Sequence, residues 1–407
     1  MDPTVDPRAG AFVARQPILD AAGQVFGYEL LYRAAADHTA CHDSGDCVAA
    51  RVLNDAVLTL GLDLLTGGRR AFINLTRHLL LSDVATLLPA AGVVIELLED
   101  IAIDAEIIRT CRKLRDDGYW LALDDFTFDT GAKALLPFVR FVKVDVLTTS
   151  GADCRAIQEA MPRGVRLIAE KVETAQMFAA ARTAGCTLFQ GYYFCRPATL
   201  AMEPLPMQRL AYARLLAEVN GPHVSLHQLE DLIKHDASLS VRVLRCVQSA
   251  ALGLRCEVQS IRQALVILGV DQVRKWASVW ALAGLSGGGP ELVTTGILRA
   301  RCCELVASRL MPREEASEYF LLGLCSLLDV MLGQPMPAAL GDLPLGPHVR
   351  RALLGERNRA RAVLDTVIAY AQGAWDEAAQ GAQALGVKTE TLRTAYTDAL
   401  RWARVLA

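Results

Sequence analysis

The sequence has no long hydrophobic run and no pattern that pairs its cysteines. Its longest apolar stretches, such as Trp276–Leu285 and Phe320–Leu328, are too short to span a bilayer, and the first residues lack the apolar segment of a secretory signal. None of the 11 cysteines forms a C-x-x-C pair, which is typical of reduced thiols rather than of a disulfide framework. These absences predict a cytoplasmic protein with no membrane-bound part.

A strong charge of one sign is also absent. The net charge of the 407 residues is −3, of which residues 1–200 carry −5 and residues 201–407 carry +2. Neither half has the dense basic stripe of a nucleic-acid-binding protein, so nucleic acid is not an expected partner. Hydrophobic residues make up 52% of the chain, which is enough to bury a core, and the length predicts two domains.

Residues 11–200 repeat one local pattern, in which a short apolar run ends in a polar residue and a helical segment follows. The polar ends lie 19 to 28 residues apart, which is the length of a strand, a helix and two loops. An open doubly wound sheet would also fit, but six or seven successive units favour a closed (β/α) barrel. The runs end at Asn74, Glu96, Asp124, Lys143, Glu170 and Gln190.

The polar residues at these strand ends predict a site. A cap on the following helix would explain any one of them, but not a set of amide, carboxylate and lysine side chains without serine or threonine. In a parallel barrel the carboxyl ends of all strands open onto one face, where these side chains converge. Oxygen ligands without histidine or cysteine suit Mg²⁺ or Mn²⁺, and two such ions could clamp a phosphate ester, with Lys143 beside them to orient or deprotonate water.

These residues resemble the EAL domain, the cyclic di-GMP phosphodiesterase family, over about residues 11–200. The family motif E-A-L-L-R corresponds to Glu29-Leu-Leu-Tyr-Arg33. Further matches are INLT with Asn74, ELLE with Glu96 and Glu99, and Asp124-Asp125-Phe126. The remaining matches are VKVD with Lys143, AEKVE with Glu170 and Glu173, and FQGYYF with Gln190.

The resemblance implies a role for each matching residue. The first metal, Mg²⁺ or Mn²⁺, would be held by Glu29, Asn74, Glu96 and Asp124, with Asp125 beside the second. Lys143, Glu170 and Asp125 would be catalytic, and no organic cofactor is implied. Arg33, Gln190 and Leu31 would contact cyclic di-GMP, whose phosphates suit a guanidinium. Glu99 and Glu173 would support the loops.

Three departures from the family pattern leave two functions open. A Gly-Thr-Gly loop is replaced by Thr127–Thr130 followed by Gly131, Lys171 stands where the family has a glycine, and Leu30 replaces the alanine of E-A-L. Loss of a glycine removes backbone conformations with positive φ. The first function is a signalling protein whose barrel binds cyclic di-GMP with a divalent metal, either as a phosphodiesterase that produces pGpG or as a binding domain without turnover. The alternative is a catalytically inactive adaptor that signals only through protein contacts.

Residues 201–390 change to amphipathic helical periodicity after a proline-containing stretch at 196–206. Residues 233–244 and 260–269 resemble the HDOD domain, an all-helical module of bacterial signalling. His235 and Asp236 lack the further His and Asp ligands of a metal site, and Gly323–Leu327 has neither residue where relatives keep G-L-L-H-D. We therefore expect a TIM-like barrel followed by a helical domain that binds a protein partner, with a C-terminal helix at 391–407. A homodimer is left open.

Overall fold

The computed structural model describes residues 12–33, 61–127, 131–191, 215–221, 226–235, 263, 265–266, 269–285, 290–341 and 343–406. The chain divides into two units, one comprising Met1–Phe194 with Tyr370–Trp375 and the other Cys195–Ala369 with Asp376–Ala407. The expected domain boundary at residue 200 lies outside the described residues. Within the described part of the chain, no helix is both long and apolar enough to cross a membrane.

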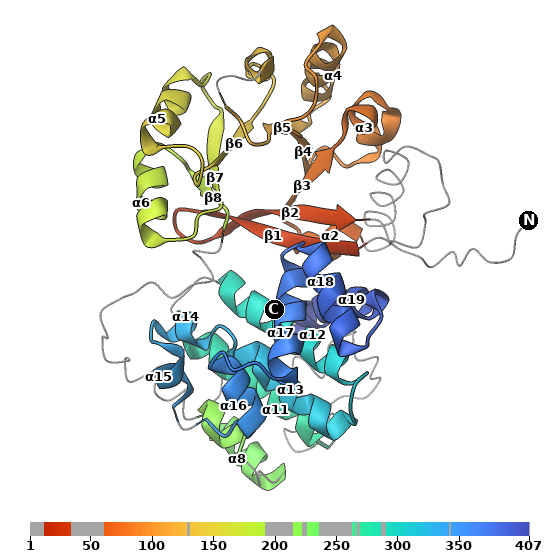
Figure 1. The fold of residues 1–407 in the computed structure, drawn as a ribbon, viewed down its shortest axis with the longest axis vertical. Helices are drawn as coiled ribbons and strands as arrows, with labels where there is room; N and C mark the ends of the chain where they lie inside the picture. The colour runs from red at the N-terminus through yellow and green to blue at the C-terminus, as the bar shows by residue number, and fades with distance from the viewer. Residues whose placement is uncertain are drawn as a thin grey trace, which may run out of the picture. The chain divides into compact units, whose positions relative to one another are not determined.

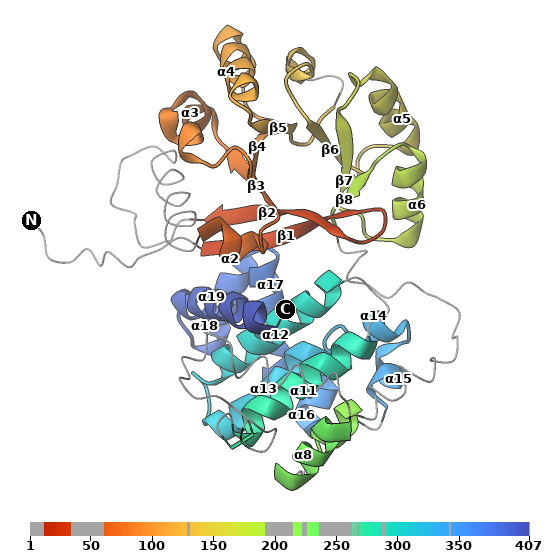
Figure 2. The same cartoon turned by 180° about the vertical axis from the view of Figure 1, so that it is seen from behind.

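Unit 1 is a closed eight-stranded barrel in which the strands follow one another in sequence order (Figures 1 and 2). Neighbouring strands in the series from β2 through β8 are parallel to each other, as the repeat predicts. The strands are β1 (Phe12–Asp20), β2 (Val25–Arg33), β3 (Arg70–Leu75), β4 (Val93–Leu97), β5 (Trp120–Leu123), β6 (Phe141–Asp145), β7 (Arg166–Glu170) and β8 (Leu188–Phe189).

The first strand departs from the parallel arrangement of the others, because β1 is antiparallel to both β2 and β8. Only residues 21–24 connect β1 to β2, a link too short for the crossover that parallel neighbours need. The carboxylate of Asp20 accepts hydrogen bonds from the backbone amides of Ala22 and Gln24, which fixes this turn. The predicted apolar runs begin only at β3 and are parallel as expected, so the antiparallel β1 lies outside that prediction.

Helices cover the outside of the barrel strands, as Figures 1 and 2 show. Polar side chains start three of them soon after a strand ends: Thr76, Ser150 and Thr174 each accept a backbone N–H in the first turn. The helical elements of unit 1 are α2 (Leu62–Thr66), α3 (Arg77–Leu81), α4 (Ala105–Asp116), α5 (Gly151–Ala160) and α6 (Ala175–Thr183), with the 3₁₀ turns η2 (Asp83–Leu87) and η3 (Gly131–Leu135).

A layer of apolar side chains forms a core inside the barrel, each contributed by a different strand. Gly27 of β2 faces this layer, and a Cβ atom there would lie 2.9 Å from the ring of Phe72 and 2.8 Å from the carbonyl of Arg70. The aromatic ring therefore takes the space that a side chain on β2 would need. The buried members of the layer are Ile18, Phe72, Val94, Ala122, Phe141, Ile168 and Leu188.

All regular secondary structure in the described residues of unit 2 is helical, as the periodicity predicts. Trp276 and Trp280 are buried one turn apart on α11. Gly323 of α13 allows close helix packing, because a Cβ there would lie 2.4 Å from the backbone of Arg299 on α12. The helices are α8 (Leu226–His235), α11 (Val270–Leu285), α12 (Pro290–Ala307), α13 (Arg313–Cys325), α14 (Leu328–Leu332), α15 (Met336–Leu340), α16 (Pro347–Leu353), α17 (Arg359–Ala371), α18 (Trp375–Leu385) and α19 (Thr389–Leu406).

Candidate active site

A polar layer lies directly above the apolar core of the barrel. Side chains on a strand alternate between its two faces, so a residue two positions from a core residue points into the same interior. On the strands from β2 to β8 the layer residue lies two positions after the core residue in sequence. On antiparallel β1 the layer residue lies two positions before the core residue. Every such position is polar. The layer comprises Gln16, Glu29, Asn74, Glu96, Asp124, Lys143, Glu170 and Gln190.

Lys143 is the centre of this layer. Its ammonium Nζ lies 3.2 Å from the nearest oxygen of Glu29, 3.2 Å from Glu96 and 3.0 Å from Asp124. The fourth carboxylate, that of Glu170, is 2.8 Å away. The Lys143 side chain is 1% exposed, so four carboxylates and one ammonium share a space from which water is largely excluded.

Amide side chains position the carboxylate of Glu29. Asn74 donates its Nδ2 to Glu29 Oε1 at 3.0 Å, and Gln190 donates its Nε2 to Glu29 Oε2 at 2.7 Å. Gln190 also donates to Gln16 Oε1 at 2.8 Å. The Tyr32 hydroxyl donates to the backbone carbonyl of Asn74. These bonds use the amide N–H groups and leave amide oxygens for other partners.

The charges in the layer shift the pKa values of its members. Burial lowers the pKa of Lys143, but the four carboxylates outweigh this and raise it well above the usual value. Burial raises the pKa of Glu29, yet Lys143 and the hydrogen bonds from Gln190 and Asn74 bring it below the usual value. Burial, opposed by Lys143, raises the pKa of Glu170 to about 7. Lys143 therefore stays charged, while Glu170 exchanges its proton near neutral pH.

Glu96 is the most enclosed carboxylate. It has no exposed surface, and burial raises its pKa well above the usual value, with further increases from the neighbouring carboxylates. Its Oε1 lies in an ion pair 3.2 Å from Lys143 Nζ, which lowers the pKa, but within the described residues neither Glu96 oxygen receives a hydrogen bond, and the same is true of Asn74 Oδ1 and Asp125 Oδ1. Buried oxygens without donors are costly unless a cation or proton approaches them.

A second group of charges lies beside the polar layer and contains Asp125, Asp145 and Lys171. Lys171 Nζ lies 2.5 Å from Asp145 Oδ2. Burial raises the pKa of Asp125, whereas the positive charge of Lys171 lowers it and the negative charges of Asp124, Asp145 and Glu99 raise it. Asp145 precedes the β6–α5 loop and accepts a hydrogen bond from the backbone amide of Leu147 at 2.8 Å. This group is thus closer to neutrality than the layer around Lys143.

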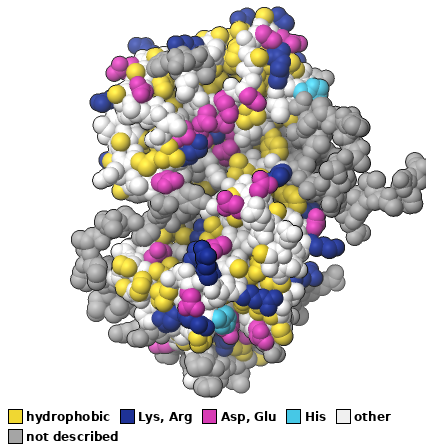
Figure 3. Space-filling model, viewed as in Figure 1, with side chains coloured by type: hydrophobic (Ala, Val, Ile, Leu, Met, Phe, Trp, Pro, Cys, Tyr) yellow, Lys and Arg dark blue, Asp and Glu magenta, His cyan; other side chains and the backbone are white. Residues whose placement is uncertain are grey.

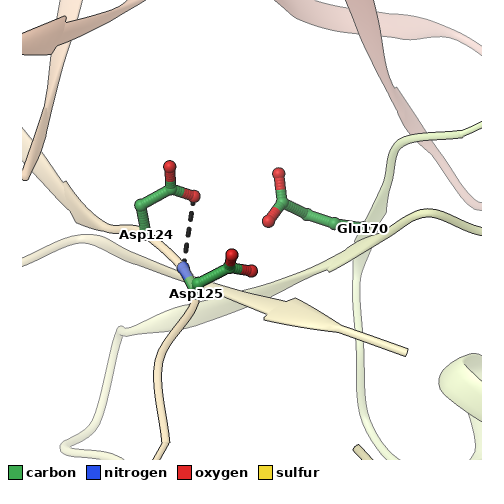
Figure 4. A group of neighbouring side chains, drawn as sticks. All are labelled: Asp124, Asp125 and Glu170. Atoms are coloured by element: carbon green, nitrogen blue, oxygen red, sulfur yellow. Dashed lines mark hydrogen bonds between the residues drawn. The ribbon is translucent and has the colours of Figure 1, made fainter. Parts of the chain in front are cut away.

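The two groups meet at Asp124, Asp125 and Glu170, which form a triad with the geometry of a metal site. Each of the three can offer one oxygen, and these oxygens lie within 4.8 Å of one another. Figure 4 shows their carboxylates pointing into one space from two separate strand ends. In the space-filling view, acidic side chains also gather over the middle of unit 1 (Figure 3). Oxygen ligands of this kind, together with the Asn74 and Glu96 oxygens that receive no hydrogen bond within the described residues, fit Mg²⁺ or Mn²⁺.

The remaining predicted residues lie around this site. Leu31 is half-buried on β2, two residues beyond Glu29, and Arg33 is exposed at the last position of the strand. Glu99 is exposed after β4, and Glu173 is half-buried three residues beyond β7. Of the altered loop, Thr127 is exposed, and residues 128–130 lie outside the described residues. The roles given to these residues stay predictions.

Two residues of the site were not predicted from the sequence. Asp145 is two positions beyond Lys143 on β6, so strand alternation alone would place both on one face. Gln16 is two positions before Ile18 on β1, and finding it requires knowing that β1 is antiparallel. The residues that were predicted at strand ends do lie together in one layer.

Fold and site define a (β/α)-barrel protein with a carboxylate-rich polar layer at the carboxyl ends of its parallel strands. A family model of the EAL domain matches residues 9–197, and one of the HDOD domain matches residues 205–335. The chain is 32% identical over 405 residues to the uncharacterized protein YuxH of Bacillus subtilis (strain 168), covering 97% of this chain and 98% of that relative. It is 31% identical over 408 residues to the cyclic di-GMP phosphodiesterase CdgJ of Vibrio cholerae, covering 99% of this chain and 94% of CdgJ.

Solved structures with EAL domains are also similar to part of the chain. The Klebsiella pneumoniae BlrP1 calcium and cyclic di-GMP complex is 26% identical, with a TM-score of 0.40, over 49% of this chain and 58% of that one. An EAL domain protein from Listeria monocytogenes is 23% identical, with a TM-score of 0.37, over 47% of this chain and 90% of that one. On its full-length relatives and its two domain matches, the chain belongs to the family of EAL–HDOD proteins. The predicted family and the predicted barrel-plus-helical fold are confirmed.

Proposed function

We propose that unit 1 binds cyclic di-GMP together with Mg²⁺ or Mn²⁺ and hydrolyses it to pGpG. The observation that carries this proposal is the polar layer, in which four carboxylates lie within 3.2 Å of one buried ammonium and carboxylate and amide oxygens remain without donors. The relative CdgJ, which is described as a cyclic di-GMP phosphodiesterase, supports the choice of substrate.

The metal-binding residues in this proposal are those with oxygens aimed into the layer. Glu29, Asn74, Glu96 and Asp124 would hold the first cation, and Asp125 would lie beside the second. Four carboxylates against a single ammonium leave formal negative charge, which favours cation binding. When bound, a divalent cation supplies positive charge that polarises the phosphate and the attacking water.

Lys143 and Glu170 take different parts in moving the proton of the water. Because its pKa is raised well above the usual value, Lys143 remains an ammonium and orients water rather than deprotonating it. The Glu170 carboxylate lies 2.8 Å from Lys143 Nζ, and in the metal-free chain burial raises the pKa of Glu170 to about 7. Glu170 is therefore the proposed base and Lys143 the residue that holds it in place.

The reaction is an in-line displacement at one phosphorus atom. The oxygen of water forms a bond to phosphorus, the bond from phosphorus to the 3′ oxygen breaks, and the 3′ oxygen takes up a proton to give pGpG. Arg33, Leu31 and Gln190 contact the dinucleotide in this proposal, with the guanidinium on a phosphate. Glu99 and Glu173 support the loops around them.

Unit 2 acts in this proposal as a regulatory, protein-binding module in the cytoplasm. The match to the HDOD domain supports this role. Ser326 and Leu327 stand at the positions where relatives keep His and Asp, and the Ser326 hydroxyl donates to the backbone carbonyl of Gly323. Leu327 has no ligand atom in its side chain, so this pair cannot act as the His and Asp of a metal site.

The experiment that tests this function uses the full chain with cyclic di-GMP and Mn²⁺, measuring binding by calorimetry and pGpG by chromatography. The variant Glu29→Ala removes a proposed metal ligand, and Glu159→Ala removes an exposed carboxylate of α5 as a matched control. We expect wild type and Glu159→Ala to produce pGpG and Glu29→Ala to lose production by at least about a hundredfold. Binding without product would show a cyclic di-GMP sensor, and neither binding nor product would show the inactive adaptor. Product that persists in Glu29→Ala would contradict the site.

A further inference from the structure

Lys171 adopts a backbone conformation that lysine rarely takes. Its φ is 55°, and of the non-glycine residues that the structure describes only Asp125, with φ 40°, is also in this region. Both residues directly follow a carboxylate of the polar layer, Glu170 and Asp124. A left-handed conformation outside glycine costs free energy and persists where surrounding contacts hold it. Among the non-glycine residues of the described ranges, this conformation thus occurs only at two positions beside the charge groups.

The contact that accompanies this strain is an ion pair. The ammonium of Lys171 lies 2.5 Å from Asp145 Oδ2, and the Asp145 side chain is only 11% exposed. The same ammonium acts on two more carboxylates: together with the Asp145 hydrogen bond, the charges of Asp125 and Glu170 raise the pKa of Lys171. Lys171 thus carries a fixed positive charge to the edge of the site.

The two charge groups are neutralised to different degrees. Around Lys143 four carboxylates face one ammonium, and the fully buried Glu96 oxygens receive no hydrogen bond within the described chain. In the second group, the ammonium of Lys171 faces two carboxylates, those of Asp125 and Asp145. The formal charge of the first group is therefore more negative than that of the second, so the first group attracts a further cation more strongly.

We propose that Lys171 is the resident cation of the Asp125–Asp145 pair and weakens the uptake of a second divalent cation. The chain then binds one Mn²⁺ tightly at the Lys143 group, and a second Mn²⁺ enters only when Lys171 leaves Asp145. The side chain is 52% exposed, so solvent can receive it when it is displaced. This inference rests on the metal binding in the proposed function and adds the residue that sets the number of cations bound.

Manganese binding to the full chain without nucleotide tests this inference. Equilibrium dialysis gives the number of ions and their affinities, and electron paramagnetic resonance shows whether two bound Mn²⁺ ions are coupled to each other. Lys171→Gly removes the charge and suits the positive φ, whereas Lys171→Met removes the charge and keeps the side-chain stem. Lys171→Arg keeps the charge, and Lys113→Met removes an exposed lysine of α4 as a matched control.

We expect one tight Mn²⁺ in wild type, Lys171→Arg and Lys113→Met, and a second, spin-coupled Mn²⁺ in Lys171→Gly and Lys171→Met with at least about tenfold higher affinity than in wild type. Two ions of equal affinity in wild type, unchanged by either substitution, would overturn the inference and leave the proposed function standing. A gain in Lys171→Gly alone would assign the effect to backbone strain and also overturn it. No Mn²⁺ bound by any variant would contradict the proposed function itself.

Discussion

The sharpest consequence of the polar layer concerns the loss of its central cation. Substituting Lys143→Met keeps much of the side-chain volume and removes the charge that lies within 3.2 Å of four carboxylates. Removing one partner from a buried ion pair costs about 3–5 kcal/mol, because the remaining charges stay buried without compensation. We expect unit 1 to lose about this much stability when no metal is present.

The size of this loss depends on pH and on divalent cations. The pKa of Glu96 and that of Glu170 are raised, so protonation near pH 5 relieves part of the repulsion that Lys143→Met creates. At pH 8 these carboxylates are ionised to a greater extent and the loss is larger. Added Mg²⁺ replaces the missing positive charge and restores part of the stability.

Hydrogen exchange measured by mass spectrometry reads the stability of unit 1 in the intact two-unit chain. The amides of β4, β6 and β7 are followed at pH 8 with EDTA and then with Mg²⁺, and Lys113→Met serves as the charge control. A loss of 3–5 kcal/mol corresponds to a rise of about 10²–10³-fold in strand opening. Protection equal to wild type at pH 8 in EDTA would refute the claim that Lys143 neutralises the layer.

Two further predictions follow from single residues. Burial raises the pKa of Glu170 to about 7, so the folded chain keeps a proton that the unfolded chain releases above about 4.5. In the absence of metal, the free energy of unfolding therefore falls by up to about 3 kcal/mol as the pH rises from 4.5 to 7. Glu170→Gln should remove this pH dependence of the free energy of unfolding, which hydrogen exchange measures at several pH values. A pH dependence that is unchanged in the variant would show that another group causes it. Gly27→Ala places a Cβ 2.9 Å from the Phe72 ring and should destabilise unit 1 by about 1–3 kcal/mol in thermal melts. Gly151→Ala at the start of α5 meets no atom within 4 Å and should leave the melt within about 0.5 kcal/mol of wild type, and equal melts for both variants would contradict the packing argument.

The repeat of apolar runs with polar ends was enough to predict the barrel and much of its polar layer. It works because a parallel barrel brings the carboxyl end of each strand to one face, whatever the loops do. Asn74, Glu96 and Lys143 could therefore be placed together without knowing their distances. The enclosure of Lys143 by four carboxylates could not be predicted, because it depends on strands far apart in sequence closing into one ring.

The residues that the sequence did not predict depend on details of the backbone. Gln16 faces the layer only because β1 runs antiparallel, and the short link that reverses it does not resemble the other connections. Lys171 could be recognised as an unusual residue, but its positive φ and its ion pair with Asp145 come from the path of the chain beyond β7. These features are local geometry, which residue type alone does not fix.

The central claim is that the polar layer directs water onto a phosphodiester bond of cyclic di-GMP. The most direct measurement is turnover by the full chain with Mn²⁺ in ¹⁸O-labelled water, with the product analysed by mass spectrometry. We predict pGpG that carries one ¹⁸O atom on its newly formed terminal phosphate, produced by wild type and not by Glu29→Ala. Bound cyclic di-GMP that yields no labelled pGpG in wild type would contradict the claim.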